Sequence, residues 1–285
     1  MADKEFTVQF DTLKKLIDMH DGTFAERAAS SSAHNNGMTW VEAAALGIMA
    51  PDVRVVAAFG NNTDVDQSTV PEELWPGGGS YPYMTAATSL EVVSTSAADT
   101  ALGTGARSVI VIGLDVNYVE QSDVVVMSGT TPVQLPRQYF RINMVELVSA
   151  GTGRVNAGTI NIRNTGAGTI RAIMPLGTGS SQQAVYTVPA GHTFLIRSTI
   201  GTINLTSGID KNVTIGTHVR LANGTSRRRG QFSLSSIVPF HLTSDFVFPL
   251  PEKTDVSLEV TFTATNDVNV TAGFTGVLIK NTAIQ

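Results

Sequence analysis

The spacing of hydrophobic residues changes near residue 83, and helix-like spacing occurs only before that point. Leu13, Leu16 and Ile17 recur at i, i+3 and i+4, which is the spacing of one face of a helix. Asp11 can cap this segment at its start, and Gly22 follows its end as a stop signal. The pattern predicts a short amphipathic helix with an apolar stripe.

A second predicted helix has a clearer start signal. Glu42 follows Thr39 at the spacing of a reciprocal capping box, and an Ala-rich apolar run continues toward Pro51. The polar stretch 61–68 has no periodicity. Because helices this short are marginal in water, residues 1–83 are predicted to be an N-terminal docking arm that orders against another protein. Its predicted contact residues are Leu13, Leu16, Ile17, Phe24 and Trp40.

From about Ser89 onward, the spacing becomes the period-two alternation of β-strands, with frequent turn signals. Residues 108–112 and 122–127 are predicted to form a hairpin. Within the strand 139–148 the apolar face changes sides, which predicts a β-bulge near Met144. Further strands of this first unit are predicted at 159–163 and 169–173.

A stretch rich in Gly, Ser and Gln at 177–183 is the predicted boundary to a second unit. Hydrophobic and polar residues alternate through 256–263, so this strand is predicted to have one buried face and one wet face. The predicted fold is mainly β: an extended N-terminal arm with short helices, then two antiparallel β-sandwich or jelly-roll units at 84–176 and 177–285. Other strands of the second unit are predicted at 184–188, 193–197, 212–221, 231–237, 245–248 and 274–279.

Composition narrows the classes of function. The 285 residues carry 19 Lys and Arg against 24 Asp and Glu, and this net charge of −5 argues against coating nucleic acid or an anionic membrane. Cys is 0, which excludes disulfides, thiolate zinc sites and cysteine nucleophiles. The sequence has no apolar run of bilayer length and opens on charged residues, so we expect a soluble chain made in the cytoplasm.

Motifs for catalysis or cofactor binding are weak. Gly103 and Gly105 precede a strand rather than a helix, so they predict a turn and not a dinucleotide site. Asp64 and Asp66 could offer oxygens to calcium, but their loop lacks the glycine and final Glu of an EF-hand. The 5 histidines are too scattered to nominate a metal site. We expect no enzyme activity, no cofactor and no metal.

Arg227, Arg228 and Arg229 form the densest positive charge in the sequence. Turn-forming residues flank them on both sides, which predicts a hairpin loop that projects three guanidinium groups outward. A solvated loop explains them, and so does an interface that pairs them with carboxylates of a neighbouring copy or partner. Nucleic acid is a weaker third alternative on an acidic chain.

Several segments resemble a recurrent sequence in virion proteins of tailed bacteriophages. The resemblance covers residues 75–280 and consists of strands and turns without catalytic residues. It implies a β protein with a structural role on a phage particle, assembled with other virion proteins and with copies of itself. The segments are TSLEVVSTSAADT at 88–100, GTGARSV at 103–109, GLD at 113–115, SGTTPV at 128–133, YTVPAGHT at 186–193 and FPLPEKTD at 248–255.

The leading hypothesis is therefore a decoration protein of the capsid head or neck, located in the virion, that docks through its arm. The alternative is a tail appendage or fibre protein that contributes to binding the host surface. A depolymerase is a third hypothesis, but the aromatic residues that stack on sugars are only 7% of the chain.

Overall fold

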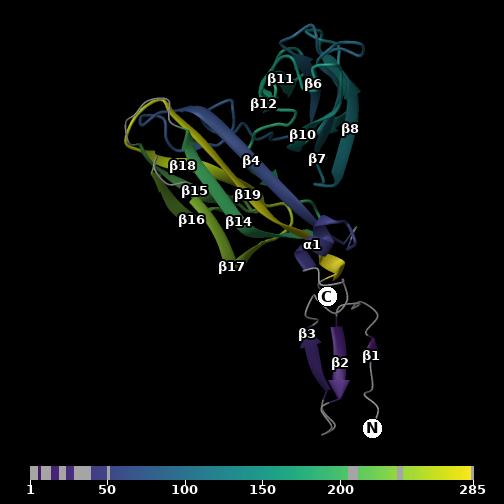
Figure 1. Cartoon of the computed structure of the whole chain (residues 1–285), viewed down its shortest axis with the longest axis vertical. Helices are drawn as coiled ribbons and strands as arrows, with labels where there is room; N and C mark the ends of the chain where they lie inside the picture. The colour runs from purple at the N-terminus through teal and green to yellow at the C-terminus, as the bar shows by residue number, and fades with distance from the viewer. Residues whose placement is uncertain are drawn as a thin grey trace. The chain divides into compact units, whose positions relative to one another are not determined.

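The computed structural model of the chain describes residues 6–7, 14–18, 24–28, 40–49, 52–204, 211–235 and 240–283 (Figure 1). Side chains are described at 42–49, 52–204, 211–235 and 248–283. The chain forms two compact units, Met1–Val56 with Val277–Gln285, and Ala57–Gly276. No helix among the described residues combines the length and hydropathy needed to cross a membrane.

The first unit opens with a small antiparallel sheet of β1 (Phe6–Thr7), β2 (Lys14–Asp18) and β3 (Phe24–Ala28). Strand β2 lies where the sequence predicts the first short helix, and it pairs with both β1 and β3. Three apolar residues at helical spacing cover little more than one turn, and so short a helix nucleates poorly. The same residues therefore remain available for pairing between strands.

Helix α1 (Trp40–Ala45) confirms the second predicted helix, with Glu42 in its first turn. Gly47 follows it at a φ of 72°, a left-handed conformation that suits glycine at a helix end. The next element, β4, begins at Val53. Ala44 packs in a small core with Val53 and Val277, which belong to the two ends of the same unit.

The second unit is an antiparallel β structure, which confirms the mainly β class. We call the pair of sheets β10-β7-β8 and β12-β11-β6-β9 sandwich A, and the pair β13-β18-β15-β16 and β17-β14-β19-β4 sandwich B. The strands of sandwich A are β6 (Thr88–Ser94), β7 (Ala106–Leu114), β8 (Glu120–Val126), β9 (Val133–Tyr139), β10 (Arg141–Ala150), β11 (Ile160–Asn164) and β12 (Ile170–Met174). Those of sandwich B are β4 (Val53–Val65), β5 (Glu72–Glu73, paired with β18), β13 (Val185–Thr187), β14 (His192–Asn204), β15 (Asn212–Arg220), β16 (Ser226–Ser235), β17 (Phe240–Leu250), β18 (Asp255–Thr263) and β19 (Val268–Lys280), and the 3-10 turn η1 (Asn281–Ala283) follows.

Sandwich A has a core to which both of its sheets contribute, including Val109 and Val125 from one sheet and Leu90 and Ile160 from the other. Strands β7 and β8 form the predicted hairpin. The register of β10 against β7 shifts between Ile142 and Met144, which confirms the predicted bulge. Local alternation was therefore enough to define these elements.

Sandwich B includes strands that the sequence assigned to the arm. The segment 53–65 forms β4, next to β19, and β5 pairs with β18. The polar stretch that begins at Asn61 is therefore part of a strand rather than a connector, because sheet pairing satisfies its backbone. Asn62 is buried and donates to Glu72 at 2.8 Å. The aromatic contact of Phe194 in β14 with Tyr186 in β13 joins the two sheets, and Phe194 also contacts Phe274 of β19 within its own sheet.

The prediction that the strand at 256–263 has one buried face and one wet face is wrong, because both faces of β18 are buried. Val256, Leu258 and Val260 are fully buried as expected, but the intervening Ser257 and Glu259 are also covered. Strand β18 lies inside its sheet, where it pairs with β5, β13 and β15, and side chains of nearby strands cover its polar face, as Arg228 does at Glu259. Phe262, which the pattern placed in the core, is 52% exposed.

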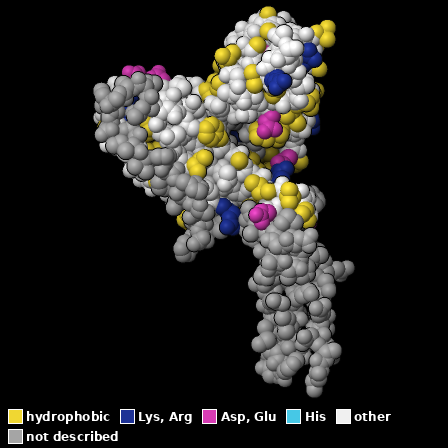
Figure 2. Space-filling view, viewed as in Figure 1, with side chains coloured by type: hydrophobic (Ala, Val, Ile, Leu, Met, Phe, Trp, Pro, Cys, Tyr) yellow, Lys and Arg dark blue, Asp and Glu magenta, His cyan; other side chains and the backbone are white. Residues whose placement is uncertain are grey.

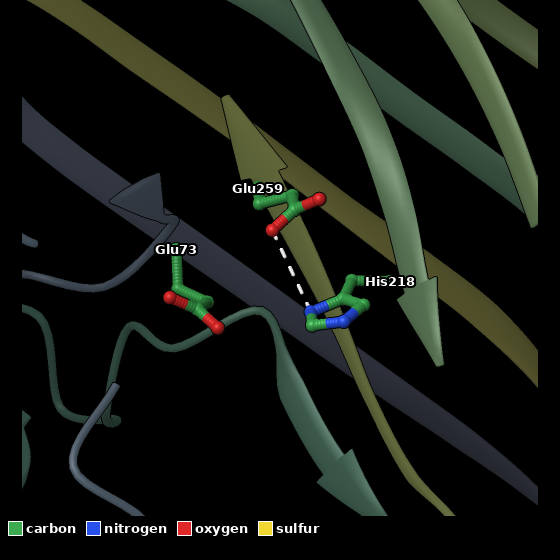
Figure 3. Close-up of side chains that lie close together, drawn as sticks. All are labelled: Glu73, His218 and Glu259. Carbon is green, nitrogen blue, oxygen red and sulfur yellow. Dashed lines mark ion pairs between the residues drawn. The ribbon is translucent and has the colours of Figure 1, made fainter. Parts of the chain in front are cut away.

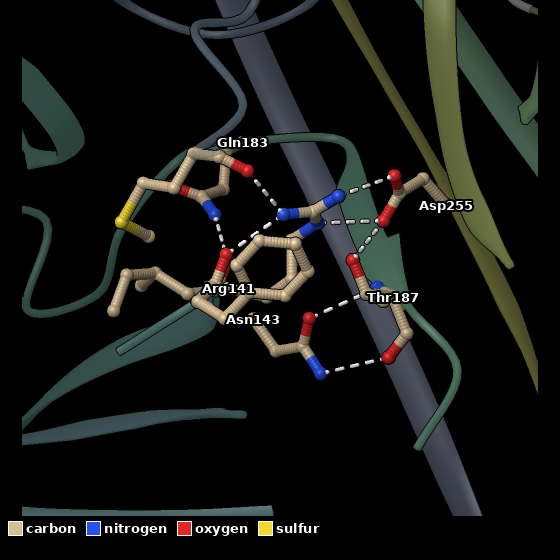
Figure 4. Close-up of polar contacts among 8 residues, drawn as sticks. Arg141, Asn143, Gln183, Thr187 and Asp255 are labelled. Atoms are coloured by element: carbon tan, nitrogen blue, oxygen red, sulfur yellow. Dashed lines mark hydrogen bonds and ion pairs between the residues drawn. The ribbon is translucent and has the colours of Figure 1, made fainter. Parts of the chain in front are cut away.

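A buried ion pair joins the two sandwiches within the second unit (Figure 4). Arg141 of β10 donates to Asp255 of β18 through Nε at 2.8 Å and Nη2 at 3.0 Å. Thr187 Oγ1 donates to the same carboxylate, and its backbone exchanges two hydrogen bonds with the Asn143 amide. Arg141 and Asp255 are 8% and 4% exposed, and Phe140 lies 4.1 Å from the guanidinium. The two hydrogen bonds of this pair fix both the distance and the orientation between the guanidinium and the carboxylate.

A second buried carboxylate, that of Asp99, ties loops of sandwich A together. It is fully buried and accepts hydrogen bonds from the backbone of Ala106, Ala157 and Gly158 and from the Ser94 hydroxyl, at 2.6–2.9 Å. These donors replace the water that the carboxylate loses on burial. The predicted turn at Gly103 and Gly105 is confirmed, since the chain turns there just before β7, and a side chain at Gly105 would overlap the Asp99 carboxylate.

Candidate functional site

The outer face of the sheet β10-β7-β8 is apolar although it faces away from the core. Successive residues of a strand point to opposite faces. Val109, Val111 and Val125 belong to the core of sandwich A, so Ile110 and its cross-strand partner Val124 point outward. Isoleucine and valine suit a pleated surface, which explains why they form strands but not why several of them lie on the outer side.

Cross-strand pairing aligns these outward side chains into one surface. Val124, Val126 and Val148 are 61%, 57% and 51% exposed, and the side chains between them are partly covered by their neighbours. In the space-filling view, hydrophobic side chains lie at the surface around the strands of sandwich A (Figure 2). We call this set the aliphatic outer face: Ile110, Ile112, Val124, Val126, Met144 and Val148.

Polar residues also lie on this outer face. Ser108 and Ser149 face each other across β7 and β10, with their hydroxyl oxygens 2.6 Å apart. Glu146 is exposed directly opposite Ile110, between Met144 and Val148 along β10. The face is therefore mostly aliphatic and carries one carboxylate, on a strand at one edge of the three-stranded sheet.

The structure corrects the placement of the three arginines. Arg227, Arg228 and Arg229 lie in β16, after a turn at 221–225, and not in the hairpin loop. All three are exposed, but Arg228 folds back onto its own sheet and donates to Glu259 Oε1 at 2.7 and 2.9 Å. A role for these arginines between copies of the chain stays a prediction.

The predicted contact residues of the arm are placed only by the strand or helix in which they lie. Leu13 lies outside the described residues. Leu16 and Ile17 are in β2, Phe24 is in β3 and Trp40 begins α1, but their side chains also lie outside the described part of the chain.

The candidate calcium ligands Asp64 and Asp66 are brought together with Asp267 at the surface of sandwich B. The charge of Asp66, followed by partial desolvation, raises the pKa of Asp64. The cluster is exposed and contains carboxylates alone, so it resembles the acidic groups that are common on protein surfaces.

A second cluster was not foreseen from the sequence. Glu73 of β5, His218 of β15 and Glu259 of β18 converge on one face of a sheet in sandwich B (Figure 3). Potential ligand atoms of the three side chains all lie within 4.8 Å of one another. Their positions in the sequence are far apart, and only the pairing of β18 with β5 and β15 brings them together.

The environment of this cluster is largely closed to water. Glu73 and Glu259 are 5% and 4% exposed, and burial followed by the charge of Glu259 raises the pKa of Glu73. Burial is the main cause that lowers the pKa of His218, and nearby Arg220 and Arg228 lower it further, although Glu259 acts in the opposite direction. The imidazole is therefore held in its neutral form near neutral pH.

No protein-family model and no curated protein matches this sequence. Among solved structures, it is similar to a structure of the infectious bursal disease virus Gt strain, with 12% identity over 85% of this chain and 78% of that chain at a TM-score of 0.23. A mutant VP2 protein of the same virus, in T=1 particles, has 12% identity, 80% and 69% coverage and a TM-score of 0.24. Its VP2 subviral particle has 15% identity, 81% and 72% coverage and a TM-score of 0.19. At these scores the matches do not establish a shared fold.

Proposed function

We propose that the protein is a structural component of a bacteriophage virion, and specifically a decoration subunit of the head or neck. The aliphatic outer face carries the proposal. A stable sheet that presents a mostly aliphatic surface to solvent is typical of a protein that buries this surface in an assembly. The resemblance of residues 75–280 to virion proteins of tailed phages supports the phage particle as that assembly.

The occupant of the aliphatic outer face is a second copy of this chain. Around a two-fold axis, the aliphatic side chains of one copy can pack against those of the other, while Glu146 on the outer strand β10 stays in contact with water. Val124, Val126 and Val148 are more than half exposed, so burial of each would contribute about 1 kcal/mol. The part of the predicted arm that precedes β4 then serves a different contact, with another protein of the particle.

Internal ties make the second unit suited to this role. The buried pair Arg141–Asp255 holds sandwich A to sandwich B, and Asp99 fixes four points of the loops in sandwich A. A subunit that keeps its shape loses less conformational freedom on assembly, so more of the contact energy contributes to binding.

The test is a double variant, Val124→Asp with Val126→Asp, produced during phage growth in place of the wild-type protein. Two carboxylates on this face would be buried against two others, so incorporation into purified particles should fall at least tenfold. Val116→Asp is the matched control, because Val116 is equally exposed, at 55%, but lies between β7 and β8. Copies per particle are counted by quantitative mass spectrometry against the major shell protein.

The counts distinguish the hypotheses. Hundreds of wild-type copies, lost in the double variant and retained in the control, support a head decoration subunit. A dozen copies or fewer would replace the decoration role with the tail-appendage alternative, which host-adsorption assays would then test. Absence of the protein from purified particles would reject a virion role altogether.

A further inference from the structure

The cluster of Glu73, His218 and Glu259 has a geometry that sheet register imposes. Glu73 lies directly opposite Glu259 in the pairing of β5 with β18. His218 lies opposite Ser257, two residues before Glu259 on β18, so it occupies the same face of the sheet. Three side chains with ligand atoms therefore point into one space from three different strands.

Two like charges directly opposite each other on antiparallel strands destabilise a sheet, and burial increases the effect. Arg228 offsets this charge only in part. It binds Glu259 through Oε1, while Oε2 of the same carboxylate faces the imidazole. Glu73 accepts a backbone hydrogen bond from Tyr81 and lies near Arg220; both lower its pKa, but burial and the charge of Glu259 outweigh them. A cation between the carboxylates would remove the repulsion.

The hydrogen bonding of His218 leaves one ring nitrogen directed at this space. Nε2 is 2.5 Å from the Ser226 hydroxyl, and Nδ1 is 3.5 Å from Glu259 Oε2. When Nε2–H donates to Ser226, the lone pair of Nδ1 faces a lone pair of the carboxylate. Histidines that bind metals characteristically donate their other N–H to an acceptor in this way.

The distance between these two atoms fits a metal ion. Two ligand atoms that are each about 2.1 Å from a tetrahedral ion lie about 3.4 Å apart. The imidazole is 21% exposed, so a fourth ligand can reach the ion from solvent. Gly216 contributes to the arrangement, because a side chain there would meet the Arg228 side chain on its way to Glu259.

We propose that Glu73, His218 and Glu259 bind a divalent transition-metal ion, with Zn²⁺ the best match to one imidazole and two carboxylates. The ion ties the short strand β5 to β15 and β18. The exposed cluster of Asp64, Asp66 and Asp267 lacks an imidazole and is the natural comparison within the same chain.

The first test is titration of the full-length protein, stripped with EDTA, with ZnCl₂ at pH 7.5 by isothermal calorimetry. One ion should bind per chain, and both Glu73→Gln and His218→Gln should weaken binding at least 100-fold. His192→Ala and Asp66→Asn are matched controls, since each removes a ligand type elsewhere and should leave the affinity unchanged. Equal affinity in wild type, Glu73→Gln and His218→Gln would overturn the proposal, as would the absence of binding to the wild-type protein.

Two further measurements test the site without a measured affinity. Glu73→Gln removes the like-charge pair, so without metal it should melt at a higher temperature than the wild type and should gain nothing from added Zn²⁺. A lower melting temperature without metal, combined with a retained gain on addition of Zn²⁺, would contradict the assignment. In the unmodified protein, Co²⁺ should show the intense visible bands of four-coordinate cobalt, and weak octahedral bands alone would count against the site.

Discussion

Replacing Arg141 with methionine tests whether the buried ion pair holds the second unit together. The substitution keeps an unbranched side chain but leaves the Asp255 carboxylate, which is 4% exposed, without its cation. Removing one partner of a buried pair costs about 3–5 kcal/mol. Thr187 still donates to the carboxylate, and this places the expected loss toward the lower end of that range.

The measurement is urea unfolding, followed by far-UV circular dichroism and by tryptophan fluorescence. With a slope of about 3 kcal/mol/M, a loss of about 3 kcal/mol moves the midpoint of unfolding by about 1 M. Because the pair joins strands of different sandwiches, the two probes should also separate in Arg141→Met while they coincide in the wild type.

Two further variants test whether the loss of stability is specific to the buried ion pair. Arg163→Met is the matched control, because Arg163 binds Glu91 at 2.7 Å within one sheet of sandwich A and is 23% exposed, so its loss should cost about 1 kcal/mol. Arg141→Met with Asp255→Leu should recover part of the loss, because no charge is left unpaired. A midpoint for Arg141→Met within about 0.3 M of the wild type, with coincident probes, would refute the reasoning.

Three other outcomes are expected. Burial raises the pKa of Glu91, but hydrogen bonds from Arg163 and two backbone N–H groups outweigh it and lower the pKa overall. Its stabilisation is therefore complete above about pH 5 and is lost as the pH falls through 4.3 and below, so melting temperatures of Glu91→Gln from pH 3 to 6 should show a flatter acid limb than the wild type. Arg228→Ser should lower the free energy of unfolding in urea by about 1–2 kcal/mol, because the buried Glu259 loses its partner, whereas Arg229→Ser should stay within about 0.5 kcal/mol. Deleting residues 1–30 should reduce incorporation into particles while the circular dichroism of the β body is unchanged, and normal incorporation would reject the docking role of the arm.

The elements that could be predicted from the sequence are those that depend on neighbouring residues. The hairpin of β7 and β8 and the bulge near Met144 follow from alternation over about ten residues, and α1 follows from the spacing of Thr39 and Glu42. Such signals survive in a single sequence because the residues that cause them are adjacent.

The remaining features depend on partners far along the chain. Arg141 and Asp255 are 114 residues apart, and β4 completes its sheet only next to β19, near the other end of the sequence. A polar stretch such as 61–65 looks like a connector until a distant strand satisfies its backbone. In the same way, Glu73 and His218 carry no local sign that they meet.

A peptide inserted into the loops of sandwich A would have a different effect from one inserted into the turn at 221–225 of sandwich B. Hydrogen bonds to the Asp99 carboxylate hold both Ser94 and Ala106 in place. An epitope inserted between these two residues would therefore have to break a fully buried hydrogen bond. The turn at 221–225 closes through its own backbone hydrogen bonds and is mostly exposed. A short tag placed there would give antibodies or gold particles a way to test, without disturbing the fold, whether this chain is part of a virion.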